Sequence, residues 1–171
     1  MGLDKSGDIY IVDIHRDRYE FPDLKRKMIM LNNQWRGKGL RGIYIEDKAS
    51  GQSLIQELKR ESGVAVIPYR ISTDKVTRLS AVLPLIEGGR VLLPDSATWL
   101  DTFHDECQTF PSGKHDDQID ALSIGLDVLA RTPSTGEYYK PPSFTTSKKN
   151  SGIFSHKSDL NSGLSWRNWG E

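Results

Sequence analysis

Short apolar runs alternate with longer segments of helical periodicity along most of this chain, and no other feature of the sequence restricts the fold as strongly. The apolar runs with the composition of β-strands cover residues 9–14, 42–47, 64–69 and 90–94. The segments whose apolar spacing predicts helices cover about residues 21–35, 51–62, 74–87, 97–110 and 115–130. Pro84 predicts a kink or an early end in the third of these helices. Strands that alternate with helices of this length predict an α/β fold with largely parallel strands in its second half.

Residues 4–8, DKSGD, have the composition of a hairpin turn, in which Gly7 can take a positive φ. A hairpin needs a strand on each side, but only residues 1–3 precede this turn. We therefore expect the chain to begin inside a fold, after its opening strand or strands.

From about Thr132 the periodic pattern ends, and the sequence becomes rich in Ser, Thr, Pro, Gly and Asn. Such a segment lacks the apolar surface that offsets the entropy lost on ordering. We expect one domain over residues 1–131 and a largely disordered tail over residues 132–171. In a second interpretation, the spaced aromatic residues of this tail dock on a partner.

Composition excludes several classes of protein. The 171 residues include 23 Lys plus Arg and 23 Asp plus Glu, so the net charge is zero and binding to nucleic acid must depend on local charge. No apolar run approaches the roughly 18 residues that span a bilayer, and the N-terminus has no signal-peptide core. The single Cys107 provides no disulfide and no zinc-binding spacing, and we expect it in the core rather than as a nucleophile. We expect an intracellular protein that, without a Walker A pattern, does not hydrolyse ATP by itself.

Two acids, Glu46 and Asp47, end the predicted strand over residues 42–47. Ligands of open α/β sheets gather at the carboxyl ends of strands, and a metal ion or a basic partner offsets the desolvation of an acid placed there. In the purely structural alternative, one of the two acids caps the helix that starts at Gly51 or pairs with Lys48.

A second acidic cluster, His115-Asp116-Asp117 followed by Asp120, opens the last predicted helix. Asp117 and Asp120 stand three residues apart and therefore share a helical face. Adjacent carboxylates repel one another unless a cation lies between them. In the structural alternative, acids in a first turn interact favourably with the helix dipole. That alternative accounts for one or two acids but not for three preceded by a histidine, so the cluster favours a metal site.

The two clusters together predict a site for Mg²⁺ or Mn²⁺, because both ions prefer carboxylate oxygens. Two such ions about 3.5–4 Å apart hydrolyse phosphodiesters, since one activates water and the other stabilises the leaving oxygen. Lys75 and Arg78 lie one helical turn apart, and either meet phosphates or form a solvated helix face.

Three segments, IEDKASGQSLIQEL (45–58), DKVTRLSAVLPLIEGGRVLLP (74–94) and FPSGKHDDQIDALSIGL (110–126), closely resemble the C-terminal nuclease domain of the large terminase subunit of tailed bacteriophages. The resemblance covers residues 1 to about 130 in unbroken order. It implies an RNase H-like fold, with a mixed sheet flanked by helices. It also implies a metal-dependent endonuclease that cuts concatemeric double-stranded DNA at the start and end of genome packaging. Another RNase H-like nuclease, such as a resolvase or an integrase, leaves the DKASG and KVTR motifs unexplained.

The resemblance also implies roles for individual residues. The expected ligands of Mg²⁺ or Mn²⁺ are Glu46, Asp117 and Asp120, and the expected catalytic residues are these three and Asp116. The choice between Glu46 and Asp47 stays open, as does the choice among the three aspartates. By analogy with the family, the residues expected near the DNA strand being cut are Lys48, Lys75 and Arg78.

The partners that the resemblance implies are double-stranded DNA, the ATPase segment or another chain of the large subunit, the small terminase subunit and the portal protein. The implied location is the cytoplasm of the bacterial host, and transiently the procapsid portal.

The sequence departs from the family pattern at its start. The family's first acid lies on the opening strand, before the DKSGD-type hairpin, and has no match here: Asp4 and Asp8 lie in the turn, and Asp13 lies on a different strand. The ATPase domain that normally precedes the nuclease is also absent from the sequence. We therefore expect weak or no nuclease activity from this chain alone, and an open sheet edge that pairs with another chain. The alternative is a catalytically incomplete remnant or docking module that binds portal protein or other terminase pieces.

Overall fold

The computed structural model describes residues 1–61 and 63–132. In chain order, its elements are β1 (Gly2–Leu3), β2 (Ile9–Tyr10), α1 (Phe21–Arg36), β3 (Ile43–Glu46), α2 (Ala49–Lys59), β4 (Val66–Tyr69), α3 (Lys75–Glu87), β5 (Val91–Leu92), α4 (Leu100–Thr109) and α5 (Asp117–Ala130). A helix lies at each predicted place, with ends that differ by a few residues. The predicted tail, except for Thr132, lies outside the described residues.

Local signals in the sequence explain several element boundaries. Helix α3 begins after Asp74, whose carboxylate accepts a hydrogen bond from the N–H of Thr77 at 2.9 Å. The early end that Pro84 suggested does not occur, because α3 continues to Glu87. The predicted turn over residues 4–8 joins β1 to β2, and Gly7 adopts a φ of 86° there.

The strands form two small sheets. In the first, with the order β1-β2-β5, β1 and β2 are antiparallel while β2 and β5 are parallel; in the second, β3 and β4 are parallel. The predicted strand over residues 9–14 pairs with β5 only as far as Ile11, whose N–H donates to the carbonyl of Leu92 at 2.9 Å. Pro94 has no N–H with which to continue the ladder. Strands β1 and β3 each lie at the end of their sheet.

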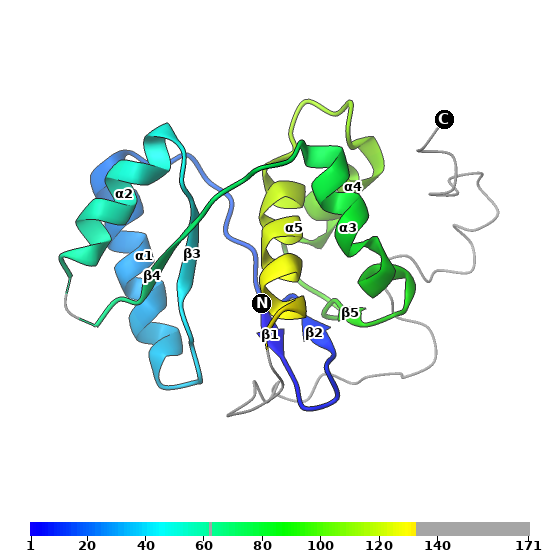
Figure 1. Ribbon diagram of the computed structural model, residues 1–171, viewed down its shortest axis with the longest axis horizontal. Coiled ribbons are helices and arrows are strands. Elements are labelled where there is room, and N and C mark those ends of the chain that lie inside the picture. Colours follow the sequence, from blue (N-terminus) through cyan, green and yellow to red (C-terminus); the bar gives the residue numbers. More distant parts are fainter. Residues whose placement is uncertain (62, 133–171) are drawn as a thin grey trace.

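Most of the core belongs to one part of the molecule, which we call the α5 half and which consists of β1, β2, β5, α3, α4 and α5 (Figure 1). Helix α5 packs against both α3 and α4. The buried core residues of this half are Ile9, Ile11, Leu79, Val82, Ile86, Val91, Phe103, Cys107, Phe110, Ile119, Leu122 and Leu126.

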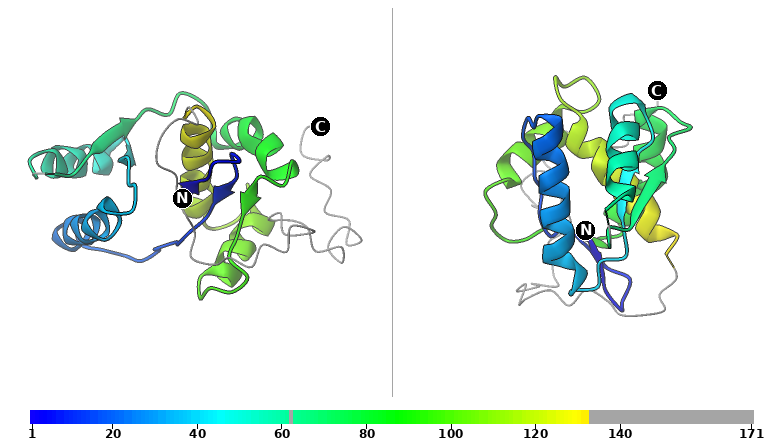
Figure 2. Two further views of the ribbon diagram at one scale, coloured as in Figure 1. Left: turned by 90° about the horizontal axis from the view of Figure 1, so that it is seen from below. Right: turned by 90° about the vertical axis from the view of Figure 1, so that its left-hand side faces the viewer.

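The α1 half consists of α1, β3, α2 and β4, and it lies to one side of α5 in Figures 1 and 2. Helix α2 packs on α1 and on both strands of the second sheet. The buried apolar side chains of this half are Leu54, Ile55 and Leu58, all from α2. Among the described helices of the whole chain, none is both long and apolar enough to span a membrane.

Candidate active site

Glu46 is the last residue of β3, where it pairs in register with Tyr69 of β4. Helix α2 starts three residues later and packs its first turn onto the end of the strand. A Cβ atom at position 51 would overlap the carbonyl oxygen of Glu46, so the close approach of helix and strand requires Gly51. The backbone of Glu46 is therefore held at the carboxyl end of the strand, as the sequence predicts.

The side chains of Glu46 and Asp47 have different surroundings. The Glu46 side chain is 34% exposed, and its buried Oε1 atom lies 2.6 Å from Nζ of Lys48 without the geometry of a hydrogen bond. Asp47 instead accepts a hydrogen bond from Nε of Arg70 at 3.4 Å. The predicted structural pairing with Lys48 is thus present, and the two acids have separate basic partners.

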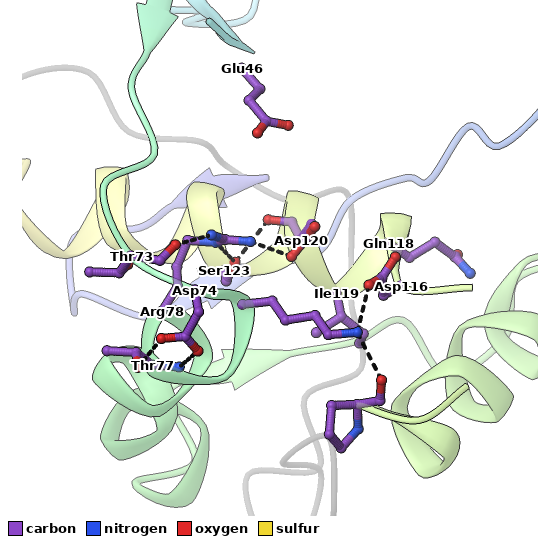
Figure 3. A network of polar contacts seen from close by, with 12 residues as sticks. Glu46, Thr73, Asp74, Thr77, Arg78, Asp116, Gln118, Ile119, Asp120 and Ser123 are labelled. Atoms are coloured by element: carbon purple, nitrogen blue, oxygen red, sulfur yellow. Dashed lines mark hydrogen bonds and ion pairs between the residues drawn. The ribbon is translucent and has the colours of Figure 1, made fainter. Parts of the chain in front are cut away.

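Asp120 lies in the first turn of α5 and pairs with the guanidinium of Arg78 from α3. Arg78 is only 8% exposed, because its Nε also donates to Oγ of Ser123 at 2.9 Å and its Nη1 donates to the carbonyl of Thr73 at 3.3 Å. Figure 3 shows this group of contacts between α3 and α5. The buried guanidinium therefore holds the Asp120 carboxylate in place.

Asp116 occupies the N-cap position of α5, but its side chain does not cap the helix. Its carboxylate accepts a hydrogen bond from Nζ of Lys75 at 2.9 Å, and the same Nζ donates to the carbonyl of Pro111 at 2.8 Å. Nζ also lies 5.5 Å from the centre of the Phe110 ring. Lys75 thus ties α3 to the loop that precedes α5.

One cavity of about 720 Å³ brings together acids that are distant in sequence. Glu46 of the α1 half lines it together with Asp117 and Asp120 of the α5 half, whereas Asp47 and Asp116 do not line it. In Figure 3 the Glu46 side chain extends toward the side of α5 that carries Asp120. The predicted shared face of Asp117 and Asp120 is the face that borders the cavity.

The comparison with protein families identifies the family of the chain. A family model described as the terminase RNaseH-like domain matches residues 3–128. The chain belongs to this family. No curated protein and no solved structure shows a significant match to the chain. The resemblance inferred from the three sequence segments is confirmed, as is the RNase H-like fold class, and the chain contains a terminase nuclease module.

The acids that line the cavity of the terminase domain have the donor type that a divalent cation prefers, but the structure does not gather them around one point. Within residues 1–61 and 63–132, no three His, Cys, Asp or Glu side chains stand close enough together to hold one metal ion. Glu46, Asp117 and Asp120 nevertheless present only carboxylate oxygens to their shared cavity, and hard oxygen donors suit Mg²⁺ or Mn²⁺. The Glu46 Oε1 atom is buried and has no hydrogen bond from any described residue, but Nζ of Lys48 lies 2.6 Å away, so a metal ion that bound this oxygen would compete with that ammonium group.

The three cations predicted to lie near DNA differ in exposure in the terminase domain. The Lys48 side chain is 69% exposed next to Glu46, and the Lys75 side chain is 37% exposed. Arg78 is buried, and its guanidinium bonds to groups of the protein itself. Of the three, Lys48 is the most accessible to a phosphate.

Two residues that line the cavity were not predicted from the sequence. Asp13 and His15 follow β2 and border the same cavity as Glu46, and Nε2 of His15 lies 3.1 Å from Oδ2 of Asp13. A spacing of two residues in an extended segment places both side chains on one face. This spacing is a signal that could have identified them as neighbours in a site.

Glu106 was also missed, although it is the most deeply buried acid near α5, at 4% exposure. Its carboxylate accepts hydrogen bonds from the start of α5. Phe103, Cys107 and Phe110 recur at helical spacing in the core, and Glu106 lies on the same helical face. This helical spacing is the signal in the sequence that could have identified Glu106 as buried.

Cys107 is confirmed as a core residue of the terminase domain. The residue is 3% exposed, and burial raises the pKa of its thiol to about 12, with the nearby charge of Glu106 acting in the same direction. A thiol with such a pKa has almost no thiolate at neutral pH, so Cys107 is not a nucleophile.

Proposed function

We propose that this terminase domain is a divalent-metal-dependent endonuclease module that cuts concatemeric double-stranded DNA during genome packaging. The observation that supports the proposal most strongly is the cavity that Glu46, Asp117 and Asp120 line from two halves of the molecule. The family match supports a nuclease module independently of that geometry.

Within the proposal, Glu46, Asp117 and Asp120 bind Mg²⁺ or Mn²⁺, and Asp116 is a further candidate ligand at the start of α5. Ions held by these residues would activate a water and stabilise the leaving oxygen of the scissile phosphate. Arg78 and Lys75 hold the aspartates of α5 in position, because each donates to one of them. Lys48 is exposed beside Glu46 and, of the three cations that the resemblance implies, is the most accessible to the DNA backbone.

A docking role is the second candidate function, and the open sheet edges favour it. Within residues 1–61 and 63–132, β1 and β3 are end strands of different sheets. Residues of both strands line the same cavity, together with apolar side chains such as Leu31 and Trp35. Unpaired strand edges beside an apolar surface are templates for a strand from another chain. The proposed partners are the ATPase segment or another chain of the large subunit, the small terminase subunit and the portal protein. The proposed location is the host cytoplasm, with transient recruitment to the portal.

Metal titration tests the nuclease proposal. We expect Mn²⁺ binding by calorimetry, and we expect Glu46→Gln and Asp120→Asn to weaken the affinity by about tenfold or more, because each removes a charged ligand. Glu87→Gln, which removes an exposed glutamate at the end of α3, is the matched control and leaves the affinity unchanged. Unaltered binding in both site variants would contradict the proposed ligands.

A plasmid-nicking assay with Mn²⁺ separates the two candidate functions. We expect weak nicking by residues 1–171 tested alone, because no residue among them matches the family's first acid. Strong nicking that Glu46→Ala abolishes would overturn that expectation. Absence of both Mn²⁺ binding and nicking, combined with a stable complex with the ATPase segment, would instead favour the docking module.

A further inference from the structure

We propose that Glu106 is a positioning residue that fixes the first turn of α5, the turn from which Asp117 and Asp120 border the cavity. The inference rests on the proposed function, in which these two acids bind the metal. Glu106 itself belongs to α4 and does not line the cavity.

The Glu106 carboxylate is fully used in hydrogen bonds to the beginning of α5. Oε1 accepts from the backbone N–H of Gln118 at 2.6 Å and from that of Ile119 at 3.2 Å, and Oε2 accepts from Nε2 of Gln118 at 2.7 Å. Nη2 of Arg16 lies 4.0 Å from Oε2 and provides a counter-charge. A buried carboxylate with these donors to both oxygens is held in a single orientation.

These bonds satisfy backbone donors that normally depend on a residue of the helix itself. The first N–H groups of a helix have no partner within the helix, and a side chain at the N-cap position usually accepts from them. In α5 the N-cap side chain, Asp116, bonds to Lys75 instead. Glu106 therefore performs from a neighbouring helix the capping that Asp116 does not.

The capping by Glu106 has a consequence for the two acids of the cavity. Aspartates near a helix N-terminus tend to turn back and accept from free backbone N–H groups. Glu106 already occupies the N–H groups of Gln118 and Ile119. Asp117 is thus left to face the cavity, on a turn that is attached to the packed helix α4. Asp120 stands on the same turn, and its carboxylate is oriented by Arg78.

The experiment compares Glu106→Ala and Glu106→Gln in the full chain, with Asp105→Asn as the matched control, because Asp105 is the exposed acid next to Glu106 on α4. Amide hydrogen exchange at Gln118 and Ile119 reports the cap, and Mn²⁺ calorimetry reports the site. We expect Glu106→Ala to accelerate exchange at both amides by about tenfold or more. We expect it to weaken Mn²⁺ binding by about 10–100-fold, the usual loss for a residue that orients a ligand.

Glu106→Gln provides a rescue that keeps the variant folded. The amide oxygen of the new glutamine can still accept from the two backbone N–H groups. The Oε1 atom of Gln118 is buried without a hydrogen bond from any described residue. Gln118 can therefore turn its amide so that this oxygen accepts from the new NH₂ group. We therefore expect exchange and Mn²⁺ affinity within about threefold of wild type. Asp105→Asn should change neither.

Each outcome decides the inference. Wild-type Mn²⁺ affinity in a folded Glu106→Ala variant overturns the inference. A Glu106→Gln variant that loses as much Mn²⁺ affinity as Glu106→Ala also overturns it, because the negative charge rather than the cap would then determine the affinity. If Glu106→Ala does not fold, near-normal exchange and affinity in Glu106→Gln support the inference. A wild-type chain that binds no Mn²⁺, or normal Mn²⁺ binding by both Glu46→Gln and Asp120→Asn, defeats the proposed function and this inference with it. The exchange data still show in that case whether Glu106 caps α5.

Discussion

The two halves of the terminase domain differ in how they are held together. In the α5 half, side chains from strands and helices interlock in one core, whereas the buried apolar residues of the α1 half all come from α2. The outward residues Tyr44 and Ile67 of the second sheet are 40% and 37% exposed. A small core resists local opening less than a large one.

This difference matters because the proposed site takes residues from both halves. Asp117 and Asp120 stand on the well-packed helix α5, while Glu46 stands on a two-stranded sheet with little core behind it. A direct polar link between the halves is the hydrogen bond from the Tyr69 hydroxyl of β4 to Asp127 of α5, at 2.8 Å. The separation of Glu46 from the aspartates therefore depends on how firmly the α1 half rests against α5.

The largest expected effect on the free energy of unfolding comes from truncating one buried leucine in the core of each half. Leu126 of α5 and Leu58 of α2 are both 0% exposed. We expect Leu126→Ala to lower the free energy of unfolding by about 3–5 kcal/mol, and Leu58→Ala by about 2 kcal/mol, because a thin core collapses more easily into the space left behind. Urea unfolding followed by circular dichroism measures both values.

Amide hydrogen exchange sharpens that comparison. Leu58→Ala should accelerate exchange in α1, α2, β3 and β4 while α3 and α5 keep their protection. Equal losses of stability in the two variants, with exchange accelerated throughout the chain, would show that the halves unfold as one unit.

A smaller effect, of about 1 kcal/mol at pH 10, is expected from the buried thiol of the α5 half. The folded protein keeps the Cys107 proton until the pH approaches its raised pKa of about 12, whereas the thiol of the unfolded chain loses its proton near 9.0. The folded state therefore binds more protons between these two values, and the free energy of unfolding falls as the pH rises above about 9.

The Cys107→Ala variant isolates this contribution, because it lacks the titrating group. Its free energy of unfolding, measured in urea at pH 8 and pH 10, should fall less than that of the wild type. Identical pH dependence in the two proteins would indicate that the thiol reaches solvent and that the core of the α5 half opens readily.

The smallest effect is expected at the link between the halves. Tyr69→Phe removes the hydrogen bond to Asp127 and should lower the free energy of unfolding by about 1 kcal/mol or less. Exchange of the β4 amides should accelerate more than that of α5 amides. Tyr44→Phe, which changes an exposed tyrosine of β3, is the control and should have no effect.

Local patterns in the sequence predicted the parts of the fold that depend on neighbouring residues. The alternation of apolar runs and helical segments predicted the α/β elements, including a helix over about residues 74–87 that is observed as α3. The spacing of Asp117 and Asp120 predicted that they share a face, which borders the cavity.

The contacts between distant segments could not be predicted in this way. Lys75 and Asp116 are separated by 41 positions, and nothing in the periodicity of either helix pairs them. The division of the strands between two sheets, and the cap that Glu106 provides to another helix, likewise depend on packing in three dimensions. The helical spacing in the sequence indicates that Glu106 is buried. It does not indicate which groups of α5 donate hydrogen bonds to the Glu106 carboxylate.

The absence of a side chain at Gly51 has a mechanical consequence. Helix α2 touches the main chain at the end of β3, so strand and helix form a stiff corner in which neither can slide along the other. Any displacement of the Glu46 main chain must therefore carry α2 with it. We therefore expect the gap across the cavity to change through movement of the α1 half as a unit rather than through the bending of a single loop.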